Sequence, residues 1–188
     1  FAYASSRSSI ADHSQALREL LEDLPPGTTF SFVGHSMGNI VVRHMIGRLE
    51  EDDPDHLLER FDSMVMLGPP NQGSEVVDKL SGMPGYYFIN GDAGMQLGTS
   101  KDSVPNSLGQ ANFDVGIIAG TRSINLILST LIPGKDDGKV SIESTYLEGM
   151  NDHIVLPVTH AFMMKNKQVI QQVIHYLATG KFNKSVDS

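Results

Sequence analysis

The chain has 188 residues, with 22 acidic against 14 basic side chains and a formal net charge of −8. No basic stripe that could neutralise phosphates stands out, which argues against a nucleic-acid partner. Cysteine is absent, so disulfides and thiol chemistry are excluded, and extracellular, periplasmic and cytoplasmic locations all stay open. The longest apolar runs, such as residues 124–132, are too short to cross a bilayer, so no integral membrane segment is expected.

The length predicts one domain over residues 1–188, large enough to bury its own core. The first residue is Phe1 rather than methionine, and no signal-peptide pattern follows it. This start indicates either a removed leader or a piece of a longer protein.

Apolar residues recur at helical spacing over residues 9–24, and "PPG" at 25–27 is expected to end that helix. The next stretch, "TTFSFV" at 28–33, is β-branched and aromatic and predicts a strand. Helical spacing returns over 37–49. The acidic stretch at 50–56 fits no metal-binding loop, so it is expected to be a solvated loop that ends the second helix.

Three short, continuous apolar runs predict buried strands at 63–67, 115–119 and 154–158. A short helix is expected near 74–81 and a last helix over 165–178, with long irregular stretches between these elements. Strands that are apolar on both faces and alternate with helices are typical of a parallel sheet covered on both sides. The predicted fold class is therefore α/β, with a mostly parallel sheet and helices on both faces.

Ser36 lies between two glycines in "SFVGHSMGNIVV", residues 31–42, after a predicted strand and at the start of a predicted helix. This is the context of a Gly-x-Ser-x-Gly nucleophile elbow, whose strained turn holds the hydroxyl out of the chain. The helix N-terminus favours developing negative charge, and the backbone N–H of Met37 would be one oxyanion donor. The alternative is a tight strand-to-helix turn that happens to contain a serine.

A nucleophilic serine needs a base and a group that orients the base. His160 lies two residues beyond the predicted strand 154–158, at the edge of the sheet where such groups gather. The alternative is a histidine that caps the last helix. The other histidines fit less well: His13, His44 and His175 lie in predicted helices, His56 in the acidic loop and His153 before its strand, while His35 is expected to point away from the serine.

The orienting carboxylate is expected between Ser36 and His160 in the sequence. Asp137 in "GKDDGKVS" is favoured, with its neighbour Asp136 as the competitor and an ordinary Asp-Gly turn as the alternative. The resulting order of serine, aspartate and histidine is the one expected for α/β-hydrolases.

These stretches together resemble the α/β-hydrolase superfamily, within its lipase and esterase group. The resemblance covers roughly residues 1–180 and is carried by four segments in the family's order. They are "FVGHSMGNIVVRHMI", "MVMLGPPNQGSEVVDKL", "DDGKVSIEST" and "VLPVTHAFMM". The resemblance implies hydrolysis of a small-molecule carboxylic ester without a cofactor or a metal. Ser36 would form the acyl-enzyme, His160 would carry the proton, and Asp137 would orient His160.

The chain departs from the family at its amino-terminal end. The family's fold begins with earlier strands and a His-Gly loop that supplies the second oxyanion donor, and "FAYASSRSSIADH" resembles the region just downstream of that loop. Three explanations are left open. The protein is a minimal hydrolase in which the Tyr3–Ser6 segment, with Ser5 in it, supplies the missing donor, or it is a fragment of a longer enzyme, or it is a homo-oligomer that covers an exposed sheet edge.

Several apolar residues are candidates for an acyl pocket, although core is the favoured interpretation of the run at 124–132. The absence of a recognisable lid favours short-chain or accessible esters. Two other functions remain open: a weak or silent hydrolase-fold binding module, and an acyltransferase or thioesterase with the same triad. The pocket candidates are Met37, Pro69, Pro70, Ile124, Leu126, Leu128, Leu131 and Ile132.

Overall fold

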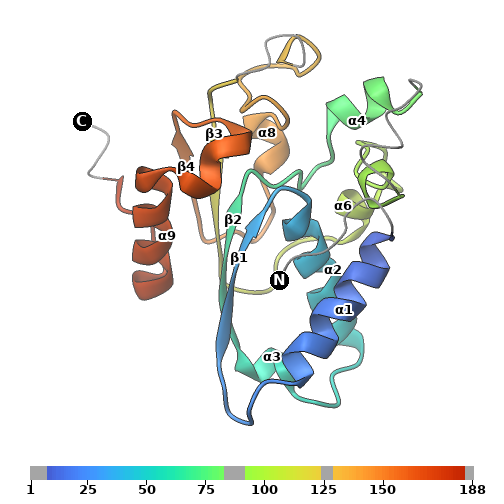
Figure 1. Cartoon of the computed structure of the whole chain (residues 1–188), viewed down its shortest axis with the longest axis vertical. Helices are drawn as coiled ribbons and strands as arrows, with labels where there is room; N and C mark the ends of the chain where they lie inside the picture. The colour runs from blue at the N-terminus through green and yellow to red at the C-terminus, as the bar shows by residue number, and fades with distance from the viewer. Residues whose placement is uncertain (1–7, 83–91, 124–128, 185–188) are drawn as a thin grey trace.

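Four parallel strands form the centre of the computed structural model, which describes residues 8–82, 92–123 and 129–184 (Figure 1). The predicted α/β class with helices on both faces of a parallel sheet is confirmed. The strands lie in the order in which they occur along the chain, so each crossover returns to the neighbouring position. They are β1 (Phe30–His35), β2 (Phe61–Leu67), β3 (Val115–Gly120) and β4 (Asp152–Leu156).

Helices α1 (Ile10–Glu22) and α2 (Met37–Glu51) cover one face of the sheet and pack on each other. A capping box begins α1: the Ser9 hydroxyl accepts from the Asp12 N–H at 3.2 Å, and the Asp12 carboxylate accepts from the Ser9 N–H at 2.9 Å. Both helices turn apolar side chains inward, including Ile10 and Ile40, which are fully buried. This burial on one stripe is what the helical spacing in the sequence predicts.

Helix α9 (Lys167–Thr179) packs against the opposite face of the sheet, and it follows the 3₁₀ helix η1 (His160–Lys165). Tyr176 and Val169 on α9 are buried against Ile118 and Leu156 of the strands. The sheet therefore has two separate apolar cores, one under α1 and α2 and one under α9.

Short helices outside these layers include α3 (Leu57–Arg60), α4 (Glu75–Leu80), α6 (Val104–Ser107) and α8 (Ile142–Thr145). Of these, the sequence predicts only α4. The acidic stretch before α3 has a local structural role, because the two oxygens of Asp53 accept the Leu57 and Leu58 N–H groups at 2.8 Å each. A single side chain thus begins a four-residue helix that has no periodicity to detect.

The predicted strand boundaries require correction at β1, β2 and β4, and β2 begins at Phe61, two residues before its predicted start. The first strand begins at Phe30 and continues to His35, and the last begins at Asp152 and ends at Leu156. Pairing with neighbours sets these ends, since His35 is in register with Leu67. Pro157 has no N–H for a sheet ladder, which is consistent with the last strand ending before it. His153 therefore lies within β4, and the prediction that it precedes its strand was wrong.

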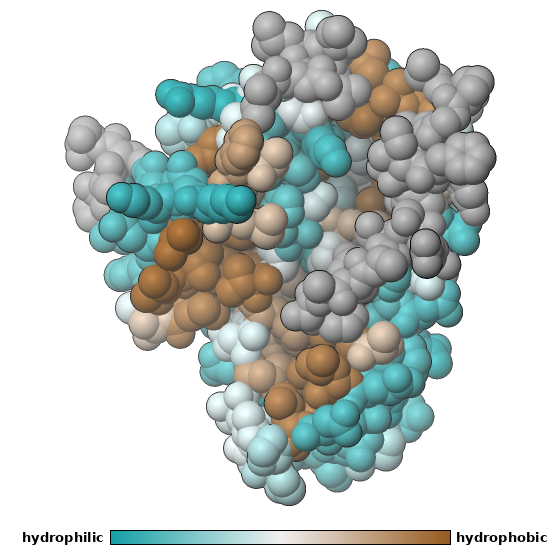
Figure 2. Space-filling model, viewed as in Figure 1, coloured by the Kyte–Doolittle hydropathy of each residue, from teal (hydrophilic) through white to brown (hydrophobic). Residues whose placement is uncertain are grey.

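Strand β1 lies at one edge of the described sheet, since β2 is its only described partner. Its Val33 side chain is 50% exposed, although the predicted sheet was apolar and covered on both sides. Hydrophobic surface extends from this strand over α9 (Figure 2), where Ile170 and Ile174 are also exposed. An apolar groove of about 250 Å³ runs between these two elements.

Candidate active site

Ser36 stands at the turn between β1 and α2 with φ 53° and ψ −129°, a left-handed backbone that a residue other than glycine rarely adopts. Its N–H donates to the Leu67 carbonyl at 2.9 Å, which ties the turn to the end of β2. The strained strand–turn–helix geometry predicted for an elbow is therefore present. It presents the serine side chain at the carboxyl ends of the strands.

Asn39, in the first turn of α2, stabilises the elbow through hydrogen bonds of its side chain. Its fully buried side-chain amide donates to the Ser36 carbonyl at 3.0 Å and to the Leu67 carbonyl at 3.2 Å. A Cβ on Gly34 would come within 2.2 Å of the Asn39 Oδ1 atom, so the first glycine of the motif leaves the space for this amide. Asn39 was not among the site residues predicted from the sequence.

Ser36, His160 and Asp137 form one hydrogen-bonded chain. The Ser36 Oγ atom lies 2.8 Å from His160 Nε2, and His160 Nδ1 lies 2.7 Å from Asp137 Oδ2. A carboxylate accepts hydrogen bonds, so His160 donates from Nδ1, and Nε2 of the neutral ring is left to accept the serine proton. His160 and Asp137 are buried, 5% and 2% exposed, which limits competition from water for these bonds.

The loop between β3 and α8 fixes the orientation of Asp137. Its Oδ1 atom accepts the backbone N–H groups of Lys139 and Val140 at 3.0 and 2.9 Å. Its carbonyl accepts the His160 N–H at 2.9 Å. One backbone bond and one side-chain bond, from His160 Nδ1 to Asp137 Oδ2, therefore join the acid to the base. Its neighbour Asp136 instead accepts from Ser129 Oγ and from the Gly138 N–H, and shapes the loop.

Gly68, directly after β2, lies against the side chains of Asp137 and His160. A Cβ at this position would lie 2.9 Å from Asp137 Oδ2 and 3.1 Å from His160 Nδ1, and the backbone is left-handed at φ +50°. In the sequence this glycine stands in a segment that resembles the family, and no role was predicted for it. Its position at the end of a strand and before two prolines was the available signal.

The substitution Gly68→Ala is expected to lower kcat for an ester substrate by about 10- to 100-fold, because displacement of the Asp137–His160 pair misaligns the base. The left-handed backbone adds a loss of about 1–2 kcal/mol in the free energy of unfolding. Gly27→Ala is the matched control, since Gly27 has φ +77° and no neighbouring atom within 4 Å of its Cβ position. Steady-state kinetics and urea unfolding of both variants separate the two effects. Equal kcat values in the two variants would contradict the prediction.

His35 also contacts the base, a contact that was not predicted from the sequence. Its Nε2 atom lies 3.0 Å from the His160 carbonyl oxygen, and the two ring centroids are 4.8 Å apart. Burial, with a smaller contribution from the charge of His160, lowers the pKa of His35 to about 4. The ring is therefore neutral near pH 7.

The remaining histidines lie elsewhere in the fold. His44 contacts Ser14 between α1 and α2, and His153 contacts Thr145 and stacks on Tyr146. His13 is on α1, His175 is on α9, and the side chain of His56 is 72% exposed. Among the described histidines, the structure brings only His160 into hydrogen-bond contact with the serine.

Of the predicted oxyanion donors, Met37 lies within the residues that the structure describes. Met37 is the first residue of α2, where the N–H groups of the first turn have no acceptor within the helix. Tyr3 and Ser5 lie outside the described residues, so the second donor suggested by the sequence stays a prediction.

The predicted pocket residues differ in burial and in their place in the fold. Pro69 and Pro70 are buried directly after β2, Met37 is half-buried against the core beneath α2, and Ile132 is 5% exposed. Leu131 is half-buried, and its carbonyl accepts from Lys79 Nζ. Ile124, Leu126 and Leu128 lie outside the described residues.

A buried network of hydrogen bonds joins the segment after β2, which contains Asn71, to α2 and α8. Asn71 donates to the Thr145 carbonyl at 2.8 Å and accepts from the Arg43 guanidinium at 3.2 Å. Arg43 also donates to the Gly109 carbonyl at 2.7 Å, and burial lowers the pKa of this arginine to about 10. These contacts connect α2, α8 and the segment that carries Gly68.

The described residues also bear on other classes of function. They hold no group of three or more histidine, aspartate or glutamate side chains placed to bind a metal ion. Within the same part of the chain, none of the helices has both the length and the apolar character needed to span a membrane.

Residues 12–69 match a family described as "Putative serine esterase (DUF676)". No curated protein sequence matches the chain. Among solved structures, the mature form of the Bacillus licheniformis lipase BlEst2 is 15% identical, with a TM-score of 0.66 over 92% of this chain and 75% of that one.

Two other solved structures are similar to this chain, and both belong to longer proteins. Phospholipase PlaB from Legionella pneumophila, in complex with thio-NAD, is 16% identical, with a TM-score of 0.70 over 96% of this chain and 50% of that one. The metagenomic carboxyl esterase MGS0156 is 17% identical, with a TM-score of 0.64 over 82% of this chain and 52% of that one. The chain thus spans about half the length of these two proteins. The sheet topology and these likenesses show that it has the α/β-hydrolase fold.

Proposed function

We propose that the protein is a serine hydrolase of carboxylic esters, with Ser36 as nucleophile, His160 as base and Asp137 as the residue that orients the base. The observation that carries the proposal is the hydrogen-bonded chain from Ser36 Oγ through both nitrogens of His160 to Asp137. The match of residues 12–69 to a serine esterase family and the likeness to a lipase, a phospholipase and a carboxyl esterase support the same chemistry.

The geometry accounts for each proton in the reaction. Ser36 Oγ forms a bond to the ester carbonyl carbon while its proton passes to His160 Nε2, which is already 2.8 Å away. The imidazolium so formed is stabilised by Asp137, and it gives its proton to the departing alkoxide as the ester C–O bond breaks. Water then attacks the acyl-enzyme by the same route, with His160 again as base, and releases the carboxylic acid.

Negative charge on the carbonyl oxygen develops next to the N-terminus of α2. The Met37 N–H is our candidate for one oxyanion donor, because it opens the helix that begins directly after the nucleophile. The helix N-terminus adds a favourable field for the same charge. The second donor would come from the segment around Tyr3 and Ser5 or from residues outside this chain.

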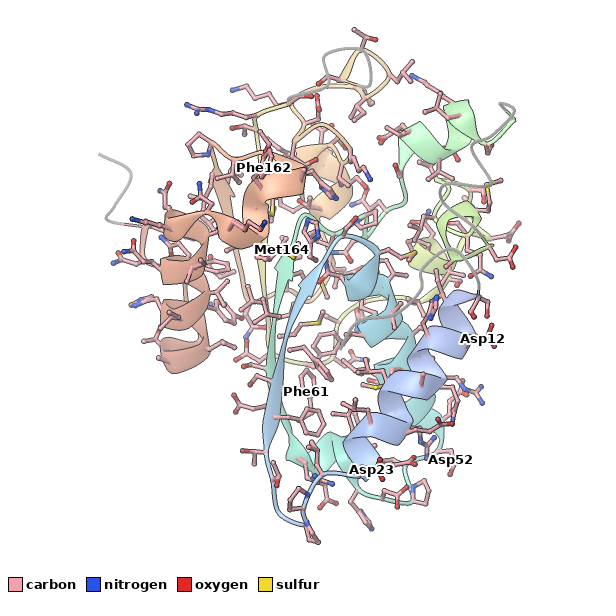
Figure 3. The ribbon with its side chains drawn as sticks, viewed as in Figure 1. Asp12, Asp23, Asp52, Phe61, Phe162 and Met164 are labelled. Carbon is pink, nitrogen blue, oxygen red and sulfur yellow. The ribbon has the colours of Figure 1, made fainter. Side chains whose placement is uncertain are left out.

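Exposed apolar side chains on η1, the 3₁₀ helix that begins at the base, favour an ester with an apolar group. Phe162 and Met164 on η1 are 58% and 52% exposed, and both follow His160 closely in the chain (Figure 3). We propose short-chain or accessible esters as substrates, with Met37, Pro69 and Pro70 around the acyl group. A steady rise in activity from acetate to palmitate esters would contradict this choice.

Hydrolysis of p-nitrophenyl butyrate by the 188-residue chain, with Ser36→Ala as the blank, tests the proposal. We expect turnover by the wild type alone, and mass spectrometry should locate a fluorophosphonate label on Ser36. A folded wild-type chain that neither turns over nor reacts with the probe would overturn the proposal and favour a silent binding module.

A further inference from the structure

His35 links the nucleophile's strand to the base through the backbone. It is the last residue of β1 and directly precedes Ser36, and its side chain lies on the same face of the sheet as Val33. From there its Nε2 atom reaches the carbonyl oxygen of His160, the first residue of η1, at 3.0 Å. One side chain therefore joins two segments that are more than a hundred residues apart in the sequence.

The chemistry of the contact fixes the tautomer of His35. A carbonyl oxygen only accepts, so Nε2 of His35 must carry the hydrogen of this bond. A neutral imidazole has one N–H, and His35 is neutral near pH 7, so its Nδ1 atom is unprotonated. The contact is thus a directed N–H to O=C bond, supported by ring packing at 4.8 Å between centroids.

The position of the His160 backbone decides the geometry of the proton transfer. The His160 N–H already donates to the Asp137 carbonyl at 2.9 Å, which anchors one side of the residue to the acid loop. The bond from His35 anchors the opposite polar group of the same residue to the strand that carries Ser36. With both bonds in place, the 2.8 Å distance between Ser36 Oγ and His160 Nε2 is set by the framework.

We propose that His35 is a positioning residue for ester hydrolysis, whose Nε2–H bond to the His160 carbonyl keeps the base in line with Ser36. The inference rests on the proposed function, but it adds a residue outside the serine, histidine and aspartate chain. It also gives a reason for a histidine, rather than any half-buried residue, next to this serine.

Three substitutions of His35 separate the bond from the ring. Glutamine places an amide N–H near the position of Nε2 and keeps the bond, whereas the shorter asparagine does not reach the carbonyl. Phenylalanine keeps the ring packing but has no donor. His153→Phe is the matched control, because it removes a comparable half-buried histidine and its 3.0 Å bond to Thr145 from β4.

We expect His35→Asn and His35→Phe to lower kcat for p-nitrophenyl butyrate by about 10- to 100-fold, as expected for a base displaced by a fraction of an ångström to an ångström. KM should change by less than about twofold, because the substrate contacts are not altered, and rates are expressed per folded molecule from urea unfolding curves. His35→Gln and His153→Phe should keep kcat within about threefold of the wild type. If His35→Phe does not fold, the asparagine and glutamine pair still decides.

Two results would overturn the inference: a kcat for His35→Asn within threefold of the wild type, or a kcat for His35→Gln as low as that of His35→Asn. Two-dimensional ¹H–¹⁵N spectra of the His35 ring give a readout that does not depend on activity. We expect the Nε2–H tautomer at pH 7, and the Nδ1–H tautomer would overturn the inference while leaving the proposed function intact. A wild type that is neither active nor labelled would instead overturn the proposed function.

Discussion

Replacing His160 by alanine is expected to lower kcat for p-nitrophenyl butyrate by about 10⁶-fold, and Ser36→Ala should lower it to a similar extent. The reason is that the two side chains perform one step: without His160 Nε2 there is no acceptor 2.8 Å from the Ser36 hydroxyl. Residues that act as a unit are not additive, so the double variant should be no slower than either single variant. Steady-state kinetics with all three variants measure this.

His175→Ala is the matched control for this experiment. His175 is half-buried on α9, in a helix that follows His160 in the chain, and is not part of the hydrogen-bonded chain at Ser36. Its kcat should stay close to that of the wild type. Residual activity of His160→Ala within about tenfold of the wild type, or additive losses in the double variant, would assign the base to another group.

The sequence was sufficient to predict the framework of this site because its signals are local. A β-branched and aromatic strand, a glycine-flanked serine and a helix with apolar spacing follow one another within residues 28–51, and each is recognisable alone. The parallel order of the strands followed from their alternation with helices. The capping box at Ser9 is another local signal, since it is made by residues three positions apart.

The features that sequence reasoning missed depend on contacts between distant segments. The contact of the His35 side chain was not predicted, because its partner is a backbone carbonyl 125 positions later, and no pattern around residue 35 encodes that loop. The role of Gly68 likewise appears only when Asp137 and His160 are placed above it. The boundaries of β4 were wrong because pairing with β3, rather than apolar character, decides where the strand starts.

The choice between Asp137 and Asp136 is of the same kind, since both precede the same glycine and both are buried. The structure separates them through the backbone. Asp137 Oδ1 accepts the N–H groups of Lys139 and Val140, which leaves Oδ2 for His160, whereas both oxygens of Asp136 are occupied within the loop. The difference gives a prediction that separates neighbouring carboxylates.

Asp137→Asn is expected to lower kcat by about 10⁴-fold, whereas Asp136→Asn should change it by only a few fold. At position 137 the two backbone donors require an oxygen at Oδ1, so the amide nitrogen must occupy the position that faces His160 Nδ1. An N–H there forces Nδ1 to accept, which moves the ring proton to Nε2 and removes the acceptor for the Ser36 hydroxyl. Kinetic measurement of kcat for both variants tests this.

At position 136 an asparagine keeps an oxygen for the Gly138 N–H and can donate its amide to Ser129 Oγ, so the loop retains its shape. The variant pair therefore has the same change in charge at adjacent residues and differs only in contact with the base. Raising the pH does not restore Asp137→Asn in this account, because the defect is a wrong tautomer rather than a missing charge. Equal losses in the two variants would mean that the charge of the loop, and not the bond to His160 Nδ1, supports the reaction.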